Sequence, residues 1–263
     1  MKDDHVVIVS AKRTPIGSFQ GDLASLKATE MGISVIKENL EETKINAGQI
    51  DEVIIGCVLP AGLGQAPARQ ASIGAGIPVS VGATTINKMC GSGMKAIMFG
   101  YDSIKSGQSN LIIAGGIESM SNAPYILPKV RNGLRMGHNE VKDHMFLDGL
   151  EDAYEEGKLM GSFAEDTAEH YQFSREDQDN FSIESLQKAK MANEQGLFKN
   201  EIVPISIKTK KNTKVIDKDE QPFKADIDKI TQLRPAFRKN GTVTAANSSS
   251  ISDGASTVIL MKE

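Results

Sequence analysis

A cysteine in a glycine-rich turn is the residue of this sequence best suited to covalent chemistry. Cys90 follows a short apolar segment and precedes Gly91, Ser92, Gly93 and a run with helical spacing. A thiol near a helix N-terminus lies at the positive end of the helix dipole, which stabilises its thiolate. The glycines let a substrate approach the backbone and leave N–H groups free for an oxyanion. This pattern favours a covalent acyl-enzyme, although a lone cysteine is about as often buried core.

The remaining cysteine and the loop histidines have less reactive settings. Cys57 lies inside an apolar run at 53–58, so we predict an inert core thiol. His138 and His144 are predicted to be surface residues, because their spacing does not suit shared metal ligation. Without metal-like cysteine or histidine spacing, no metal site is expected.

Composition excludes several classes of protein. The chain has 263 residues, of which 40% are hydrophobic and 24% charged, as in ordinary globular proteins. Its formal charge of −4 favours neither nucleic acid nor an anionic membrane as a partner. No apolar run is long enough to span a bilayer. A strand-like run starts at Val6 and leaves little room for a targeting peptide, so a cytoplasmic location is expected.

The first part of the chain alternates apolar strand patterns with helical patterns. Short apolar runs predict buried strands at 6–9, 53–58, 84–86 and 111–114. Helical spacing predicts helices over 23–40 and after the cysteine turn. The apolar face expected on the second helix comprises Met94, Ile97, Met98, Tyr101 and Ile104. Strands alternating with helices predict an α/β layered fold with a largely parallel sheet.

The pattern changes after residue 118. Ser174 and Asp177 form a capping-box signature that predicts the start of another helix. Strand character returns at 242–245 and 257–261. We therefore predict three segments: 1–118 as the first part of an α/β domain, 119–244 as an insertion, and 245–263 as its return strands.

Several motifs, in order along the chain, resemble those of one enzyme family. The stretch around Cys90, NKMCGSGMKAI, is similar to the nucleophile motif of thiolases, which make or cleave 3-ketoacyl-CoA. The other matching motifs are SAKRTPIG at 10–17, GQAPARQA at 64–71, GGIESMSNAPY at 115–125, DGLEDAY at 148–154, RPAF at 234–237 and GTVTAANSSSISDGAS at 241–256. Agreement of several separate motifs is far more specific than one short match.

The resemblance implies both a fold and a reaction. The fold would be the N-terminal half of a thiolase, a layered α-β-α structure with a mixed, mostly parallel sheet, carrying an inserted loop domain for CoA binding and tetramer formation. Cys90 would take an acyl group from acyl-CoA and pass it to an acetyl-CoA enolate or to free CoA. The Cys90 backbone N–H is an implied oxyanion donor. CoA and acetyl-CoA would be substrates, without a permanently bound cofactor or a metal.

The subclass that the motifs resemble is that of short-chain thiolases. The forms GSGMKAI and GGIESMS favour an acetyl-CoA C-acetyltransferase, which condenses two acetyl-CoA to acetoacetyl-CoA. Lys129, Arg131 and Arg135 stand where such enzymes carry a cationic loop, which suggests a homo-oligomer, either a dimer or a tetramer. The alternative within enzymes is a degradative 3-ketoacyl-CoA thiolase.

The resemblance also implies a set of CoA contacts in the later part of the chain. These are Leu159, Met160, Leu233, Phe237, Ala245, Ala246 and Ser249. Met160, together with Gly161, matches the segment that contacts pantetheine, and Ser249 is the expected hydrogen-bonding partner. Leu159 stands where many biosynthetic thiolases carry a histidine. Leu233 and Phe237 match an apolar wall near the adenine.

Three further groups of the family mechanism have no counterpart in this sequence. Thiolases carry a histidine in a GHP motif, an asparagine in an NEAF motif and a second reactive cysteine in their C-terminal half. Here no histidine follows His170 and no cysteine follows Cys90. The expectation is that the C-terminal half is absent and that the isolated chain exposes apolar surface, aggregates and is nearly inactive. A third alternative is therefore a truncated or split chain that binds CoA or a partner without turnover.

Overall fold

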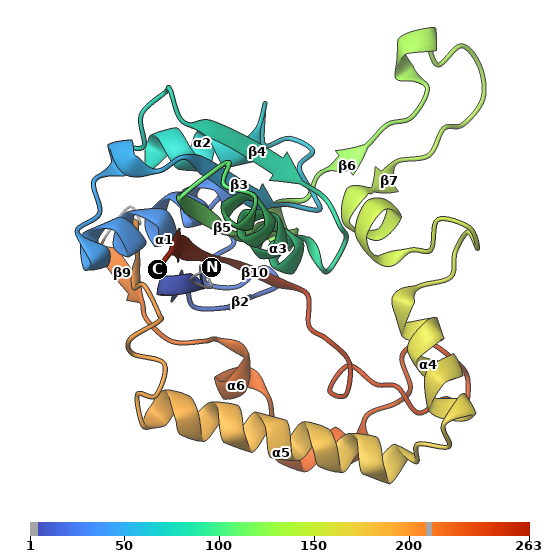
Figure 1. Cartoon of the computed structure of the whole chain (residues 1–263). Helices are drawn as coiled ribbons and strands as arrows, with labels where there is room; N and C mark the ends of the chain where they lie inside the picture. The colour runs from blue at the N-terminus through green and yellow to red at the C-terminus, as the bar shows by residue number, and fades with distance from the viewer. Residues whose placement is uncertain (1–4, 209–211) are drawn as a thin grey trace. The chain divides into compact units, whose positions relative to one another are not determined.

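The computed structural model describes residues 5–208 and 212–263 (Figure 1). The chain forms two compact units. The first unit comprises Met1–Asn122, Phe198–Lys218 and Ser252–Glu263, and the second comprises Ala123–Leu197 and Asp219–Ile251. These ranges differ from the three predicted segments, because 119–122 and 198–218 group with the first unit and 245–251 group with the second.

A six-stranded sheet forms the centre of the first unit. Its strands are β1 (Val6–Arg13), β2 (Gly17–Ser18), β3 (Glu52–Gly56), β4 (Gly82–Ile86), β5 (Leu111–Ser119) and β10 (Ser252–Lys262). The order is β1-β10-β5-β3-β4, with β2 paired to β10. β3 pairs in parallel with β4 and β5, whereas β10 is antiparallel to β1, β2 and β5. Among the described strands of this sheet β10 alone runs against the others, so the prediction of a mixed, mostly parallel sheet is confirmed.

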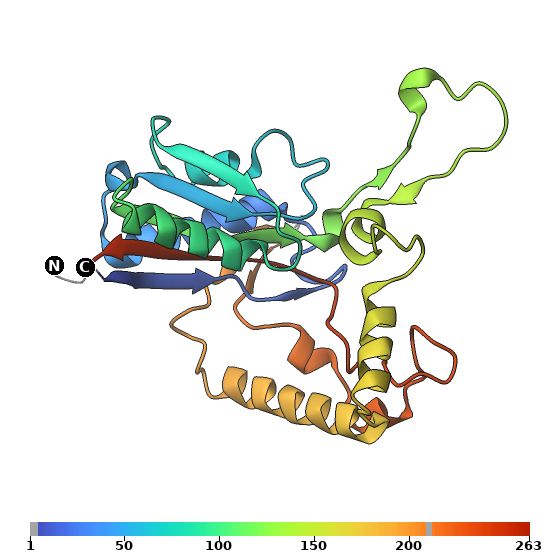
Figure 2. The ribbon, with the colours of Figure 1, turned by 45° about the vertical axis from the view of Figure 1, so that its right-hand side comes forward.

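Helices cover both faces of this sheet (Figure 2). Side chains of a strand alternate between its two faces, so neighbouring residues enter different cores. Val53 and Ile55 of β3 join a large cluster with residues of α1 (Ala28–Thr43) and α2 (Pro67–Gly74). Ile54 enters a smaller cluster with α3 (Ser92–Lys105) on the opposite face. The result is the layered α-β-α arrangement that was predicted.

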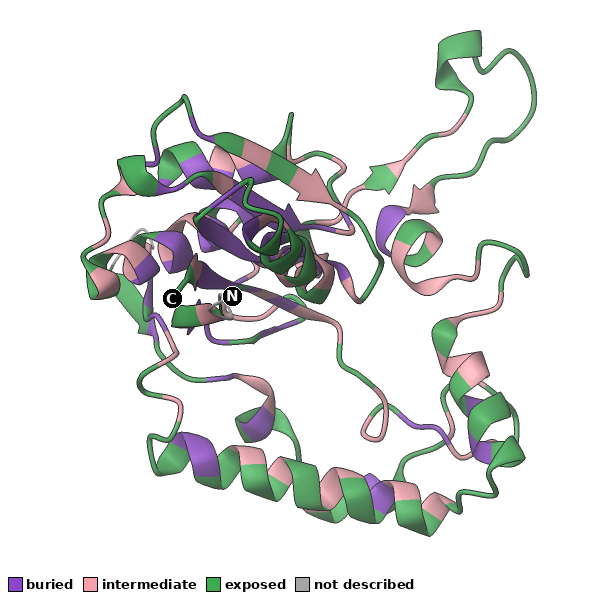
Figure 3. Cartoon of the chain, in the orientation of Figure 1, coloured by how far each residue is buried: buried purple, intermediate pink, exposed green. Residues whose placement is uncertain are grey.

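The face that α3 buries is not its most apolar one. The helix packs Ser92, Ala96, Gly100 and Ile104 inward. A Cβ added at Gly100 would lie 2.7 Å from Leu260 Cδ1, so a small residue permits this close approach to the sheet. Most of the predicted apolar face is therefore exposed, with Met94 at 71%, Met98 at 50% and Tyr101 at 47%, whereas Ile104 is buried as predicted. Figure 3 shows the outer side of α3 as mostly exposed.

A hairpin from late in the chain completes the larger core of the first unit. It consists of β8 (Ile205–Lys208) and β9 (Thr213–Ile216), which pair antiparallel. Ile205 and Ile216 are buried in that core. Arg13 of β1 forms an ion pair with Glu201 just before the hairpin, with Nε 2.6 Å from Oε1. These long-range contacts place the segment with the sheet.

Most elements of the second unit are helical. Its elements are β6 (Tyr125–Ile126), β7 (Lys142–Asp143), the π-helical turn η4 (Phe146–Leu150), α4 (Met160–His170), α5 (Arg175–Glu194), α6 (Gln221–Lys224) and the 3₁₀ segments η3 (Val130–Asn132) and η5 (Ile227–Gln232). The predicted capping box at the start of α5 is confirmed, since Asp177 N donates to Ser174 Oγ at 3.0 Å. No described helix is both long and apolar enough to cross a membrane.

Two predictions for this unit are wrong. Residues 242–245 are not a strand, because the amides of Thr242 and Val243 donate to the Glu165 carboxylate instead of to a neighbouring strand. His144 is buried, with 5% exposure, whereas His138 is exposed as expected. The burial of His144 is possible because Asp148 of η4 lies beside its ring, with Nδ1 2.6 Å from Oδ2.

Candidate active site

Cys90 lies in a tight turn between β4 and α3, as the sequence predicts. Met89 just before it has a φ of 49°, a left-handed conformation that costs energy outside glycine. Its amide donates to Asn87 Oδ1 at 2.9 Å. Ser92 Oγ accepts from Lys88 N at 2.9 Å and donates to Met89 O at 2.6 Å. The strained backbone is thus held by the turn's own polar side chains, and the Cys90 side chain is presented to solvent.

A glycine at the carboxyl end of β3 and another within β5 let the start of α3 lie directly on the sheet. A Cβ added at Gly56 would be 2.5 Å from the carbonyl carbon of Ser92 and 2.8 Å from Gly93 N. A Cβ at Gly116 would lie 3.3 Å from the Gly93 Cα. The close contact requires glycine at 56 and fixes where the Cys90 turn sits relative to the strands.

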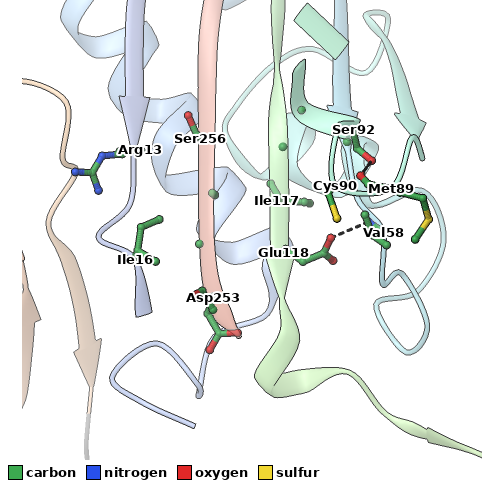
Figure 4. A pocket seen from close by; sticks show the side chains of 16 residues that line it. Arg13, Ile16, Val58, Met89, Cys90, Ser92, Ile117, Glu118, Asp253 and Ser256 are labelled. Atoms are coloured by element: carbon green, nitrogen blue, oxygen red, sulfur yellow. Dashed lines mark hydrogen bonds between the residues drawn. The ribbon is translucent and has the colours of Figure 1, made fainter. Parts of the chain in front are cut away.

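The thiol of Cys90 faces a pocket of about 330 Å³ formed within the first unit (Figure 4). Residues from β1, β5 and β10 line it beside the cysteine turn, among them Arg13, Glu118 and Asp253. Most of the remaining lining is glycine, small or aliphatic. The described lining holds neither a histidine nor a lysine, and its two carboxylates already accept hydrogen bonds from backbone amides. The pocket can hold an electrophile against the cysteine but offers little acid–base chemistry.

Glu118 is a pocket residue that sequence reasoning missed. It stands near the end of β5 and accepts from the amides of Val58 at 2.8 Å and Leu59 at 3.0 Å. These bonds hold the loop after β3 beside Cys90 (Figure 4). Its signal was present as an acidic residue near the end of an apolar, glycine-containing strand. The partners, however, are backbone groups about 60 residues earlier, which no local pattern indicates.

The environment of Cys57 is unsuited to nucleophilic chemistry. The residue is 2% exposed, and burial raises the pKa of its thiol to about 12. The charge of Glu118 and a hydrogen bond to that carboxylate contribute to this rise, with Cys57 Sγ 3.6 Å from Glu118 Oε1. The thiol therefore stays protonated near neutral pH and reacts poorly. The prediction of a buried core cysteine is confirmed.

Alkylation should separate the two thiols. With iodoacetamide at pH 8, we expect Cys90 to be modified and Cys57 to stay unmodified until the protein unfolds, because only Cys90 is exposed. The raised pKa of Cys57 also favours the folded state only while the thiol is neutral. That contribution is complete below the ordinary pKa of 9.0 and is lost as the pH rises toward about 12.

Peptide mass spectrometry with and without denaturant provides the check on both thiols. Equal labelling of Cys57 and Cys90 in the native protein would contradict the burial of Cys57. A free energy of unfolding that rises between pH 9.0 and 12 in the wild type but not in a Cys57→Ala variant would contradict the raised pKa.

The residues predicted to bind CoA all belong to the second unit. Leu159 caps the N-terminus of α4, and Met160 is the first residue of that helix, 43% exposed. Gly161 packs against the ring of Phe237 so closely that an added Cβ would lie 2.3 Å from Cε1. Leu233 follows η5 and is partly exposed. The structure thus brings the start of α4 and Phe237 together.

A second pocket, of about 440 Å³, gathers the other three predicted contacts. Ala245, Ala246 and Ser249 line it, opposite residues of α5 and α6. Leu159, Met160, Leu233 and Phe237 are not among its lining residues. Roles in CoA binding stay predictions for all seven residues.

Two other sequence-based expectations concern a cationic loop and a metal site. Lys129, Arg131 and Arg135 are exposed around η3, between β6 and β7, as a surface loop requires. Among the described residues, no group of three or more histidine, cysteine or carboxylate side chains is placed to hold a metal ion.

Comparison with known proteins gives a consistent set of relatives. The family model described as "Thiolase, N-terminal domain" matches residues 6–263. Acetyl-CoA acetyltransferase of Pseudomonas aeruginosa is 52% identical over 258 residues, covering 97% of this chain and 65% of that protein. The protein of the same name from Saccharomyces cerevisiae is 48% identical over 265 residues, covering 98% of this chain and 66% of that protein.

Solved structures agree with these sequence matches. The crystal structure of the Bacillus anthracis acetyl-CoA acetyltransferase matches with a TM-score of 0.94 at 39% identity. That match covers 99% of this chain and 66% of the other. The chain therefore spans 65–66% of the length of these relatives.

Proposed function

Because the chain belongs to the thiolase family, we propose that it transfers acyl groups between CoA thioesters through an acyl-enzyme on Cys90. The reaction would be the condensation of two acetyl-CoA to acetoacetyl-CoA and CoA, together with the reverse thiolysis. The observation that carries the proposal is the exposed thiol of Cys90 in a glycine-rich pocket, on a strained turn just before a helix.

The proposed reaction has two covalent steps. The Cys90 thiolate attacks the carbonyl carbon of acetyl-CoA, a new C–S bond forms, and the bond to the CoA sulfur breaks. CoA leaves as a thiolate and takes up a proton. A second acetyl-CoA then loses a methyl proton, and its carbon attacks the acyl carbon. A C–C bond forms and the Cys90 sulfur leaves as thiolate. In thiolysis, the Cys90 thiolate attacks the 3-keto carbon of acetoacetyl-CoA, the C–C bond breaks, and the released carbon takes up a proton to give acetyl-CoA. The CoA thiol then loses its proton and attacks the acyl carbon, and the Cys90 sulfur leaves as thiolate.

The turn also suggests which amide stabilises the oxyanion. Gly91 N donates to Lys88 O at 3.1 Å and Ser92 N donates to Met89 O at 3.0 Å, so both amides are used within the turn. We assign the oxyanion bond to the amide of Cys90 itself, as the family resemblance implies. Such donors act most strongly where charge develops in the transition state.

In the family mechanism that the resemblance implies, a histidine and a second cysteine transfer the protons. The described pocket lining lacks a histidine, and Cys57 with a pKa of about 12 cannot act as the second reactive cysteine. We therefore propose full turnover for a protein in which another segment or a partner chain provides these groups. The partners would be CoA, acetyl-CoA, acetoacetyl-CoA, and further copies of the chain in a dimer or tetramer. A chain that binds CoA or a partner without turnover is the alternative.

Substrate preference tests this proposal. The native protein should cleave acetoacetyl-CoA with CoA faster than a longer 3-ketoacyl-CoA, because its motifs resemble those of short-chain enzymes. Equal or faster cleavage of the longer substrate would favour the degradative thiolase. Binding of CoA in a calorimetric titration, by a protein that cleaves neither substrate, would support the binding-only alternative. A protein that neither cleaves these substrates nor binds CoA would contradict the proposal.

A further inference from the structure

An ion pair on α5 with a buried carboxylate links two segments of the second unit. Asp179 is 2% exposed, and its Oδ2 accepts from Arg175 Nε at 2.7 Å, one helical turn earlier. The Nη2 of the same guanidinium donates to the carbonyl of Leu233 at 2.9 Å. Oδ1 of Asp179 accepts from Asn247 Nδ2 at 3.2 Å. The pair thus joins α5 to the end of η5 and to the turn around 247.

Asn247 organises the turn that carries Ala245 and Ala246. Its Oδ1 accepts from Thr244 N at 2.6 Å, and its Nδ2 also donates to Thr242 O at 3.0 Å. The fully buried Thr244 side chain accepts from Ala246 N at 3.2 Å. The conformation of the turn therefore depends on an amide side chain that Asp179 holds in place.

A second buried carboxylate holds the start of the same turn. Glu165 of α4 is 3% exposed and accepts from the amides of Thr242 and Val243, both at 2.9 Å. An added Cβ at Gly241 would lie 2.1 Å from Glu165 Oε1, so the carboxylate occupies the space that a side chain would need. The helix that begins with Met160 is thereby connected to the turn.

We propose that Asp179 and Glu165 are positioning residues for the CoA site, an inference that rests on the proposed function. Together they hold three segments in one arrangement, those carrying Met160, Leu233 and 245–249. Burying a carboxylate is costly, and apolar packing often stabilises a protein equally well. A buried carboxylate whose hydrogen bonds are satisfied holds its partners in a defined geometry. Displacing the contacting residues by about 1 Å is enough to weaken their contacts with a ligand severely.

The test replaces the charge of Asp179 while keeping its shape. In the native protein, Asp179→Asn should raise the Kd for CoA, measured by titration calorimetry, by about tenfold or more. The KM for acetyl-CoA in acetylation of Cys90 should rise with it. Acetylation by S-acetyl-N-acetylcysteamine, which lacks the nucleotide, should proceed at the wild-type rate, because Cys90 belongs to the other unit. A purely structural defect would lower the rate of Cys90 acetylation by both donors.

A matched control and a second variant keep the inference testable. Glu184→Gln makes the same kind of change on the exposed side of α5, where the side chain is 63% exposed, and should bind CoA as the wild type does. Asn247→Ala removes the turn's partner but leaves the ion pair of Arg175 and Asp179 intact. This variant should weaken CoA binding as well. If thermal melting shows that Asp179→Asn is unfolded, Asn247→Ala serves as the test in its place.

The outcomes separate this inference from the proposed function. Folded variants of Asp179 or Asn247 that bind CoA as tightly as the wild type would overturn the inference alone. An equal fall in the rates of Cys90 acetylation by the two acetyl donors would also overturn the inference. A wild-type protein that neither binds CoA nor acetylates Cys90 would overturn the proposed function, and the inference with it.

Discussion

Cys90→Ser is expected to lower acetyl transfer from acetyl-CoA by about 10³-fold or more. Near neutral pH a thiol carries a small fraction of the strongly nucleophilic thiolate, whereas a hydroxyl needs an adjacent base. The described wall of the pocket provides neither a histidine nor a lysine for that purpose. A serine of nearly the same size would therefore leave the turn and its hydrogen bonds intact but remain unreactive.

The matched control for this result is Cys57→Ser. The hydroxyl at 57 can donate to Glu118 as the thiol does, and the residue lies in the core of the first unit. We expect the rate of acetyl transfer to stay close to that of the wild type. A Cys90→Ser variant that keeps the wild-type rate, or a Cys57→Ser variant that loses it while folded, would argue against Cys90 as the nucleophile.

Gly56→Ala is expected to destabilise the fold and to disturb the cysteine turn as well. The added methyl would lie 2.5 Å from the backbone of Ser92, which cannot move without shifting the start of α3. Overpacking against backbone should lower the free energy of unfolding by about 2–3 kcal/mol. Because Cys90 lies two residues before Ser92, its rate of reaction with iodoacetamide should change as well.

Gly82→Ala provides the matched control in the neighbouring strand. Its nearest neighbour is Glu52 Cγ at 4.0 Å, so the methyl fits without a clash. We expect the free energy of unfolding to stay within about 1 kcal/mol of the wild-type value, with a small gain from reduced chain entropy. Urea titrations of both variants give the comparison. Similar stabilities for the two would show that the contact of β3 with α3 is not tight.

Local patterns were sufficient for the elements that surround Cys90. The apolar runs at β3 and β5 and the turn before α3 follow from neighbouring residues, so sequence predicted them. The buried side of α3 did not follow from hydrophobicity, because Gly100 lets the small-residue face approach the sheet. Hydrophobic spacing identifies a helix but not which face packs when small residues permit closer contact.

The remaining misses depend on partners distant in sequence. Glu165 bonds to Thr242, 77 positions later, and this contact replaces the predicted strand with a turn. Asp179 meets Asn247, 68 positions later. The burial of His144 depends on Asp148, which an unusual π-helical turn positions beside it. Such pairings require the folded chain, and only comparison among many relatives could have indicated them earlier.

The most direct measurement is to locate the acetyl group after the native protein is mixed with isotope-labelled acetyl-CoA and quenched in acid. Peptide mass spectrometry should find one labelled acetyl group on the peptide containing Cys90, in a thioester that hydroxylamine releases. Addition of CoA before the quench should remove the label. Label on another residue, or none on a folded protein that still cleaves acetoacetyl-CoA, would contradict an acyl-enzyme on Cys90.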